Sequence, residues 1–200
     1  MGDLLGGQRG AGTRAYRLSR LLRGLAGSEP QATRAVPAGA TIVRLDEGIA
    51  PIASSIEEIG RTWRYRIGPD DRDHADLAFV EIVASIGGDA LKPFAPVAVT
   101  ARRSPQGVTL AWIRRTRRDG HAWEPVEVPL GEETERYEVG ILNGSAVLRT
   151  LASLAPAVLY PAAQELADFG APQASLNLSV AQMSAVVGRG FERAVTVAVI

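Results

Sequence analysis

The second half of the chain alternates apolar and polar positions with a period of two, which is typical of β-strands that bury one face. In the segment 108–113, Val108, Leu110 and Trp112 fall on one face, and Trp112 is predicted to lie in the core. The same period returns three times further along, at Tyr137, Val139 and Ile141, at Leu176, Leu178 and Val180, and at Val195, Val197 and Val199. Turn residues separate these segments, so the pattern predicts a β-sandwich or barrel.

Two local signals predict how these strands are joined. The pair Asn143-Gly144 is a strong hairpin signal, and the segment 147–151 returns after it as a strand. Residues 161–169 carry good helix formers behind Pro161, and Gly170 with Pro172 supplies the stop. We therefore expect residues 93–200 to form one fibronectin-III-like β-sandwich with a short helix near residues 161–169.

The first half predicts a different, β-rich module. Residues 41–45 are a β-branched strand candidate, Trp63 alternates with polar residues in 62–67, and 78–83 adds a further strand. The strand at 62–67 is expected to have one buried and one exposed face, with Trp63 in the core. Glycines at 87–88 and a proline at 93 place the boundary near residue 92. The fold class is therefore mainly all-β, with domains 1–92 and 93–200.

The first twelve residues are rich in glycine and poor in apolar pattern. Either they form a flexible tail, or the chain is the C-terminal portion of something longer. We favour the second interpretation, in which the module 1–92 is truncated at its N-terminus.

Composition narrows the classes of function. Of 200 residues, 46% are hydrophobic, which suits a chain with a real core. Twenty-two basic residues balance twenty-two acidic ones, which argues against a nucleic-acid partner because such binders carry a basic excess. There is no cysteine, and no apolar run approaches the length of about 20 residues that spans a bilayer, so no membrane insertion is expected.

No side-chain pattern predicts catalysis, a metal or a cofactor. His74 lies in an aspartate-rich segment, 70–76, which we interpret as a turn that bonds its own backbone rather than as a cation site. His121 has no evident nucleophile or carboxylate partner and is interpreted as a residue of a loop tip. The carboxylates of Glu132, Glu133 and Glu135 are assigned to a solvated loop. The sequence therefore predicts a protein that is not an enzyme.

An arginine cluster is the candidate contact surface. Its candidate residues are Arg114, Arg115, Arg117, Arg118 and, beside them, Trp123, with Arg102 and Arg103 on a neighbouring strand. Guanidinium groups bind phosphates, carboxylates or acidic sugars, but one patch requires the strand to end near Ile113, because alternation otherwise sends neighbouring arginines to opposite faces. The alternative is a solvated strand end whose arginines pair with nearby glutamates, and the neutral net charge favours it.

Several segments also resemble one protein family. The run 16–29, followed by 37–40 and the apolar segment 42–46, resembles a segment of phage tail-tip host-specificity proteins. The segments 123–131, 137–139, 165–170 and 182–190 resemble the end of the large baseplate protein of gene transfer agents. The resemblance covers roughly residue 14 to the end, and its motifs are specific in combination. The family's upstream glycoside-hydrolase-like and hub domains have no counterpart here, so no catalytic residue carries over.

This resemblance implies a structural module of a phage-like tail tip or baseplate that makes assembly contacts. Its implied partners are other tail-tip proteins and copies of itself, and its implied place is the cytoplasm during assembly and then the tail tip of the particle. The alternative hypothesis is a receptor- or glycan-binding module whose loop 117–131 contacts a cell-surface polysaccharide.

Overall fold

The structure is a computed structural model that describes residues 18–21, 23–24, 27–32, 34–118 and 128–200. The chain divides into two units, Met1–Ala53 and Ser54–Ile200. In the first unit, Glu29–Gln31 form a 3₁₀ turn, and the guanidinium of Arg23 donates to the carbonyl oxygen of Arg34 at 2.7 Å. The boundary predicted near residue 92 lies inside the second unit and stays a prediction.

Residues 41–45, which are all described, form no strand, so the prediction of a strand there was wrong. Their β-branched composition favours an extended backbone, but a strand also needs a hydrogen-bonded neighbour. The side chains of Ile42, Val43 and Leu45 are exposed. Residues 41–45 therefore have the amino-acid composition of a strand but lack a neighbouring strand to pair with.

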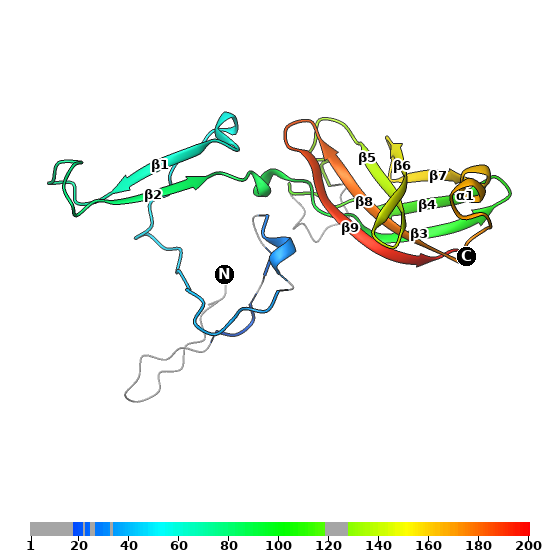
Figure 1. The fold of residues 1–200 in the computed structure, drawn as a ribbon, viewed down its shortest axis with the longest axis horizontal. Coiled ribbons are helices and arrows are strands. Elements are labelled where there is room, and N and C mark those ends of the chain that lie inside the picture. The colour runs from blue at the N-terminus through cyan, green and yellow to red at the C-terminus, as the bar shows by residue number, and fades with distance from the viewer. Residues whose placement is uncertain (1–17, 22, 25–26, 33, 119–127) are drawn as a thin grey trace. The chain divides into compact units, whose positions relative to one another are not determined.

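Two strands near the start of the second unit form an antiparallel hairpin (Figure 1). They are β1 (Thr62–Ile67) and β2 (Val80–Ser85), in the register Trp63 opposite Ala84, Tyr65 opposite Ile82 and Ile67 opposite Val80. Strands are thus confirmed at both predicted places, although β2 spans Val80–Ser85 where residues 78–83 were predicted. A 3₁₀ turn precedes the hairpin at Ile56–Glu58, where the Ser55 backbone N–H donates to Glu58 Oε2 at 2.8 Å, and another follows it at Asp89–Leu91.

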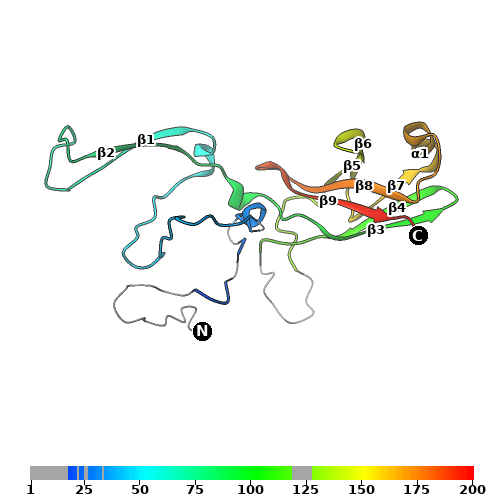
Figure 2. The same cartoon turned by 60° about the horizontal axis from the view of Figure 1, so that its bottom comes forward.

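In the part of the chain that the structure describes, the remaining strands form a β-sandwich with seven strands in two antiparallel sheets (Figures 1 and 2). One sheet has the order β3-β4-β7 and the other β6-β5-β8-β9. This three-against-four arrangement is that of a fibronectin-III-like domain, so the predicted fold class is confirmed. The strands are β3 (Val97–Ser104), β4 (Gly107–Ile113), β5 (Tyr137–Asn143), β6 (Ala146–Ser153), β7 (Ala157–Pro161), β8 (Ser175–Ser184) and β9 (Gly188–Ala198).

The core lies between these two sheets and is built from the alternating positions of the sequence. Val108, Leu110 and Trp112 enter it from β4, and Tyr137, Val139 and Ile141 enter it from β5. Strand β8 adds Leu176, Leu178 and Val180. Trp112 is only 5% exposed, which confirms the prediction that it is a core residue. Burial at this scale is the dominant favourable term in the stability of the sandwich.

Two connections between the strands match the local sequence signals. Asn143 ends β5 and pairs with Ala146 of β6, so Gly144 and Ser145 make the turn. Gly144 has a φ of 61°, in the left-handed region that favours glycine. The helix α1 (Ala162–Phe169) joins β7 to β8, and Gly170 ends it at a φ of 76°. Pro161 is the N-cap and the last residue of β7, not part of the first helical turn as predicted.

One side of the sandwich is closed by a contact between its two sheets. The end of β9 and the following residues run parallel to β3, where the Arg103 N–H donates to the Ile200 carbonyl at 2.8 Å and the Ile200 N–H donates to the Ala101 carbonyl at 3.1 Å. These bonds satisfy backbone groups that an open sheet edge would expose. At the end of the sandwich where the C-terminus lies, α1 is also found (Figures 1 and 2).

Candidate functional site

Arg114 and Arg115 follow directly after β4, which ends at Ile113 as a shared arginine patch would require. Their guanidinium groups nevertheless have different partners. Arg114 donates to the carbonyl oxygens of Val128 at 2.9 Å and Pro129 at 3.3 Å, whereas Arg115 lies over the ring of Phe94, 4.9 Å from its centroid. Both side chains therefore hold neighbouring backbone or ring groups of the same chain.

Arg117 has a partner of its own. Its guanidinium donates to Glu132 Oε1 at 2.6 Å, and the Glu132 side chain is only 6% exposed. Arg118 is exposed, and its backbone N–H donates to Thr116 Oγ1 at 3.1 Å. Arg114 and Arg117 thus both bind residues 128–132, where the chain returns toward β5, and the geometry supports intramolecular bracing by these two arginines. Trp123 and His121 lie outside the described residues.

The aspartate-rich segment between β1 and β2 bonds its own backbone, as predicted. Asp73 Oδ1 accepts from the Ala75 N–H at 2.7 Å, and Asp76 Oδ1 accepts from the Ala78 N–H at 2.8 Å. The ring of His74 packs against Phe79 with 5.4 Å between centroids. In the part of the chain that the structure describes, no three carboxylate or imidazole groups are arranged to hold a metal ion.

The aromatic residues of the sandwich form a packed layer and not a cleft. Trp112 and Tyr137 meet edge to face with 5.0 Å between ring centroids, and Tyr137 is fully buried. Its hydroxyl donates to Glu135 Oε1 at 2.7 Å. Burial, followed by this hydrogen bond, raises the pKa of Tyr137 well above its ordinary value. A phenol held neutral in this way stabilises the core and is not poised for proton transfer near neutral pH.

The helix α1 is fastened to β3 by an ion pair with a buried carboxylate, which the sequence patterns did not predict. Glu165, 1% exposed, accepts two hydrogen bonds from Arg103, at 2.8 and 3.0 Å, and a third from the Gln173 N–H at 2.8 Å. The hydrogen bond from Arg103 is the main reason why the pKa of Glu165 is lowered. Arg103, part of the predicted cluster, is therefore a structural clamp.

A second pair fastens α1 to the opposite sheet. Asp168 accepts two hydrogen bonds from Arg149 on β6, both at 2.7 Å, and one from the Tyr160 hydroxyl at 2.8 Å. The bidentate bond from Arg149 is the main cause of the lowered pKa of Asp168. The two pairs reach α1 from different sheets, so the helix ties the layers together.

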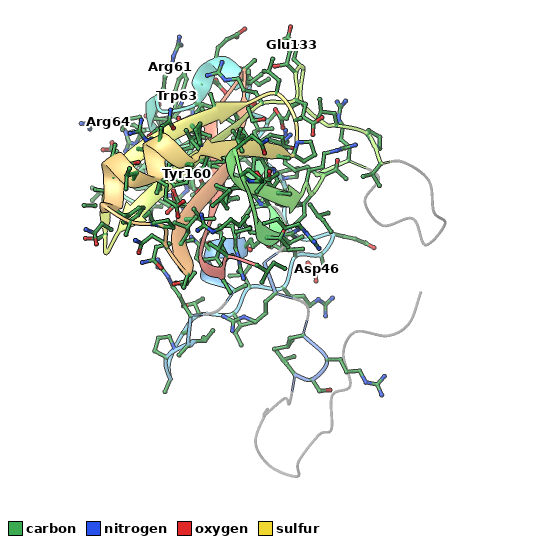
Figure 3. All side chains as sticks on the ribbon, turned by 90° about the vertical axis from the view of Figure 1, so that its right-hand side faces the viewer. Asp46, Arg61, Trp63, Arg64, Glu133 and Tyr160 are labelled. Atoms are coloured by element: carbon green, nitrogen blue, oxygen red, sulfur yellow. The ribbon has the colours of Figure 1, made fainter. Side chains whose placement is uncertain are left out.

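The hairpin exposes large apolar side chains on both of its strands. Trp63 is 37% exposed and Ile67 is 54% exposed, so the prediction that Trp63 is a core residue was wrong. Alternation correctly placed these residues on one face, but burial needs a second layer of protein over that face. Figure 3 labels Trp63 on β1 with Arg61 and Arg64 beside it, and Tyr160 on β7.

The sequence matches no protein-family model and no curated protein. Among solved structures, the chain is similar to domains d3–d4 of the extracellular region of rat CD45. The identity is 8%, the match covers 94% of this chain and 84% of that chain, and the TM-score is 0.35. A likeness at this TM-score supports no argument about function. No helix among the described residues has the length and apolar character to span a membrane.

Proposed function

We propose that this protein is a non-catalytic structural module of a phage-like tail tip or baseplate, of the kind found in gene transfer agents, and that it makes assembly contacts. The resemblance of its sequence motifs to tail-tip proteins suggests the setting. The observation that carries the proposal is the hairpin β1–β2, whose apolar side chains are exposed although the chain has a well-packed core elsewhere. Exposed apolar faces of this kind mark protein contacts.

The sandwich supports the same proposal as a rigid spacer. Large side chains such as Leu110, Trp112 and Tyr137 pack in its core. Its charged side chains Arg103, Arg149 and Arg117 form ion pairs with Glu165, Asp168 and Glu132. Groups committed to internal bonds are not available for a substrate without losing those bonds. The chain therefore combines a rigid body with a surface that suits attachment to other protein chains.

A test needs two neighbouring residues on opposite faces of β2. Ile82 lies on the apolar face and is 46% exposed, and Val83 lies on the other face and is 56% exposed. The genome that encodes the chain is altered to carry Ile82→Glu or Val83→Glu, and particles are counted by electron microscopy. We expect the chain in purified wild-type particles, at least a tenfold loss of tailed particles with Ile82→Glu, and near-normal numbers with Val83→Glu.

Two results would contradict the proposal. One is the absence of the chain from purified tailed particles. The other is binding of the isolated chain to a defined polysaccharide on a glycan array, lost on Trp123→Ala, which would establish the receptor-binding alternative in its place.

A further inference from the structure

The apolar face of the hairpin is continuous across both strands. Residues that share a face alternate along each strand, and the register pairs Trp63 with Ala84, Tyr65 with Ile82 and Ile67 with Val80. All six of these residues are apolar or aromatic and fall on the same face. Ile67 is 54% exposed and Val80 is 61% exposed, so this face, called here the hairpin face, lies open.

The opposite face of the hairpin is mainly polar, with Val83 as its apolar exception. Arg64 donates to Glu81 Oε1 at 2.9 Å across the strands, and the Arg64 side chain is 75% exposed. Thr62 and Ser85 lie opposite each other at its end. A two-stranded hairpin is marginally stable by itself and normally needs a further layer over its apolar face. The one-sided pattern therefore calls for a partner on the hairpin face and on no other.

Charge is distributed unevenly along the hairpin. The loop of residues 68–79 carries four aspartates and one arginine, a net charge of −3 with His74 neutral. The strand region, residues 61–67 and 80–85, carries three arginines and one glutamate, a net charge of +2. Two hairpins stacked in the same direction would bring their acidic loops together, whereas two stacked in opposite directions separate the loops and move each toward the basic strands of the other.

The size of the face limits the strength of such a contact. Face-to-face packing of two hairpins of this length buries on the order of 1,000 Å² in total, near the lower limit of a specific interface. Interfaces of this size are typical of weak, transient contacts, and we expect a dissociation constant on the order of 10 μM. A contact of this strength suits a module that is concentrated by neighbouring subunits in an assembly.

We infer that the hairpin face docks on the hairpin face of a second copy of this chain, with the two hairpins antiparallel. In this arrangement Tyr65 lies near the twofold axis and faces its equivalent, and Trp63 of one copy lies over Ile67 of the other. The contact is isologous, because the same residues serve both copies. This inference rests on the assembly role proposed above and names the partner of its exposed surface.

Sedimentation velocity on the full chain over about 1 to 200 μM tests the self-association. We expect a reversible monomer–dimer equilibrium for the wild type, at least a tenfold weaker dimer for Ile82→Glu, and an unchanged dimer for Val83→Glu. A wild-type chain that stays monomeric over this range overturns the inference. So does equal loss of the dimer in both variants, because the matched control alters the polar face.

Cross-linking keeps the test informative if Ile82→Glu disturbs the hairpin itself. The chain has no cysteine, so Tyr65→Cys and Arg66→Cys each introduce one thiol, on the hairpin face and on the polar face. Packed sheets lie about 10 Å apart, so a short bismaleimide spans the gap. A yield of covalent dimer from Tyr65→Cys that is at least ten times the yield from Arg66→Cys supports the inference. Equal yields from the two variants overturn it.

The two proposals fail separately. A monomeric chain that is still required in the particle, with Ile82→Glu blocking assembly, overturns docking on a second copy and leaves the assembly role in place. A chain that dimerises but is absent from particles overturns the assembly role and leaves docking on a second copy in place.

Discussion

Two tryptophans in similar sequence patterns have opposite environments. Trp112 on β4 and Trp63 on β1 each alternate with polar or small residues, yet Trp112 is 5% exposed and Trp63 is 37% exposed. The difference lies in what faces each strand, because β4 packs against a second sheet and β1 belongs to a sheet of two strands. Alternation therefore tells which residues share a face, and the neighbouring layer decides whether that face is buried.

The same contrast holds for ion pairs in the two regions. Arg103 and Glu165 meet in the sandwich with the Glu165 side chain 2% exposed, whereas Arg64 and Glu81 meet on the hairpin with side chains 75% and 45% exposed. Both distances are short, at 2.8 and 2.9 Å. Water screens the hairpin pair, whereas loss of Arg103, whose own side chain is 36% exposed, would leave the desolvated carboxylate of Glu165 without its cation.

Removal of each tryptophan gives the largest expected difference between the regions. Trp112→Ala should lower the free energy of unfolding by about 4 kcal/mol, because it leaves a cavity between the sheets. Trp63→Ala should cost less than about 1 kcal/mol at protein concentrations below 1 μM, where self-association is negligible. Urea unfolding followed by far-ultraviolet circular dichroism measures both. Equal costs would show that the hairpin face is part of a folded core.

Neutralising one carboxylate in each region sharpens the comparison of ion pairs. Glu165→Gln should destabilise the sandwich by about 2 kcal/mol, since it weakens three hydrogen bonds at a buried site and leaves Arg103 without its counter-charge. Glu81→Gln should change stability by less than about 0.5 kcal/mol. Thermal unfolding of both variants at pH 7 measures the difference. A larger loss of stability for Glu81→Gln than for Glu165→Gln would contradict the assignment of Arg103 and Glu165 as the stabilising ion pair.

Acid should weaken the sandwich through the two carboxylates that hold α1. The folded-state pKa values of Glu165 and Asp168 lie below their ordinary values of 4.5 and 3.8. Their contribution is therefore fully present above about pH 5 and is lost as the pH falls through the lowered values. We expect the melting temperature to fall between pH 5 and pH 3, and to fall less steeply in Glu165→Gln. If the melting temperatures of the variant and the wild type fall equally steeply with pH, titration of Glu165 is not a cause of the acid sensitivity.

Much of the sandwich could be predicted from sequence because its signals are local. The period of two placed Val108, Leu110 and Trp112 on one face, and Asn143-Gly144 marked a hairpin. The helix α1 was indicated by a run of residues with high helix propensity and by Gly170 at its end. Each signal acts over a few residues, so no knowledge of distant contacts was needed.

The sequence showed that the candidate arginines are clustered, but it did not show which carboxylates they pair with. Arg103 and Glu165 are separated by 62 positions, and Arg117 and Glu132 by 15. Pairing over such separations depends on where β3 meets α1, and separately on where the residues after β4 meet the segment 128–135. The weak sequence signal for Glu165 is an acidic residue on the inner side of a short helix that is followed by a proline-bearing loop, and many exposed glutamates share it.

By itself the sequence determined most strands of the sandwich, though not β7, together with the inward faces of the predicted strands and the short helix that precedes β8. It could do so because backbone preference and side-chain alternation are properties of neighbouring residues. Only the tertiary structure decided that Trp112 is covered and Trp63 is exposed, and that Arg103 and Arg149 clamp α1 from two sheets. Burial and ion pairing depend on which surfaces meet, and that is fixed by the packing of whole layers.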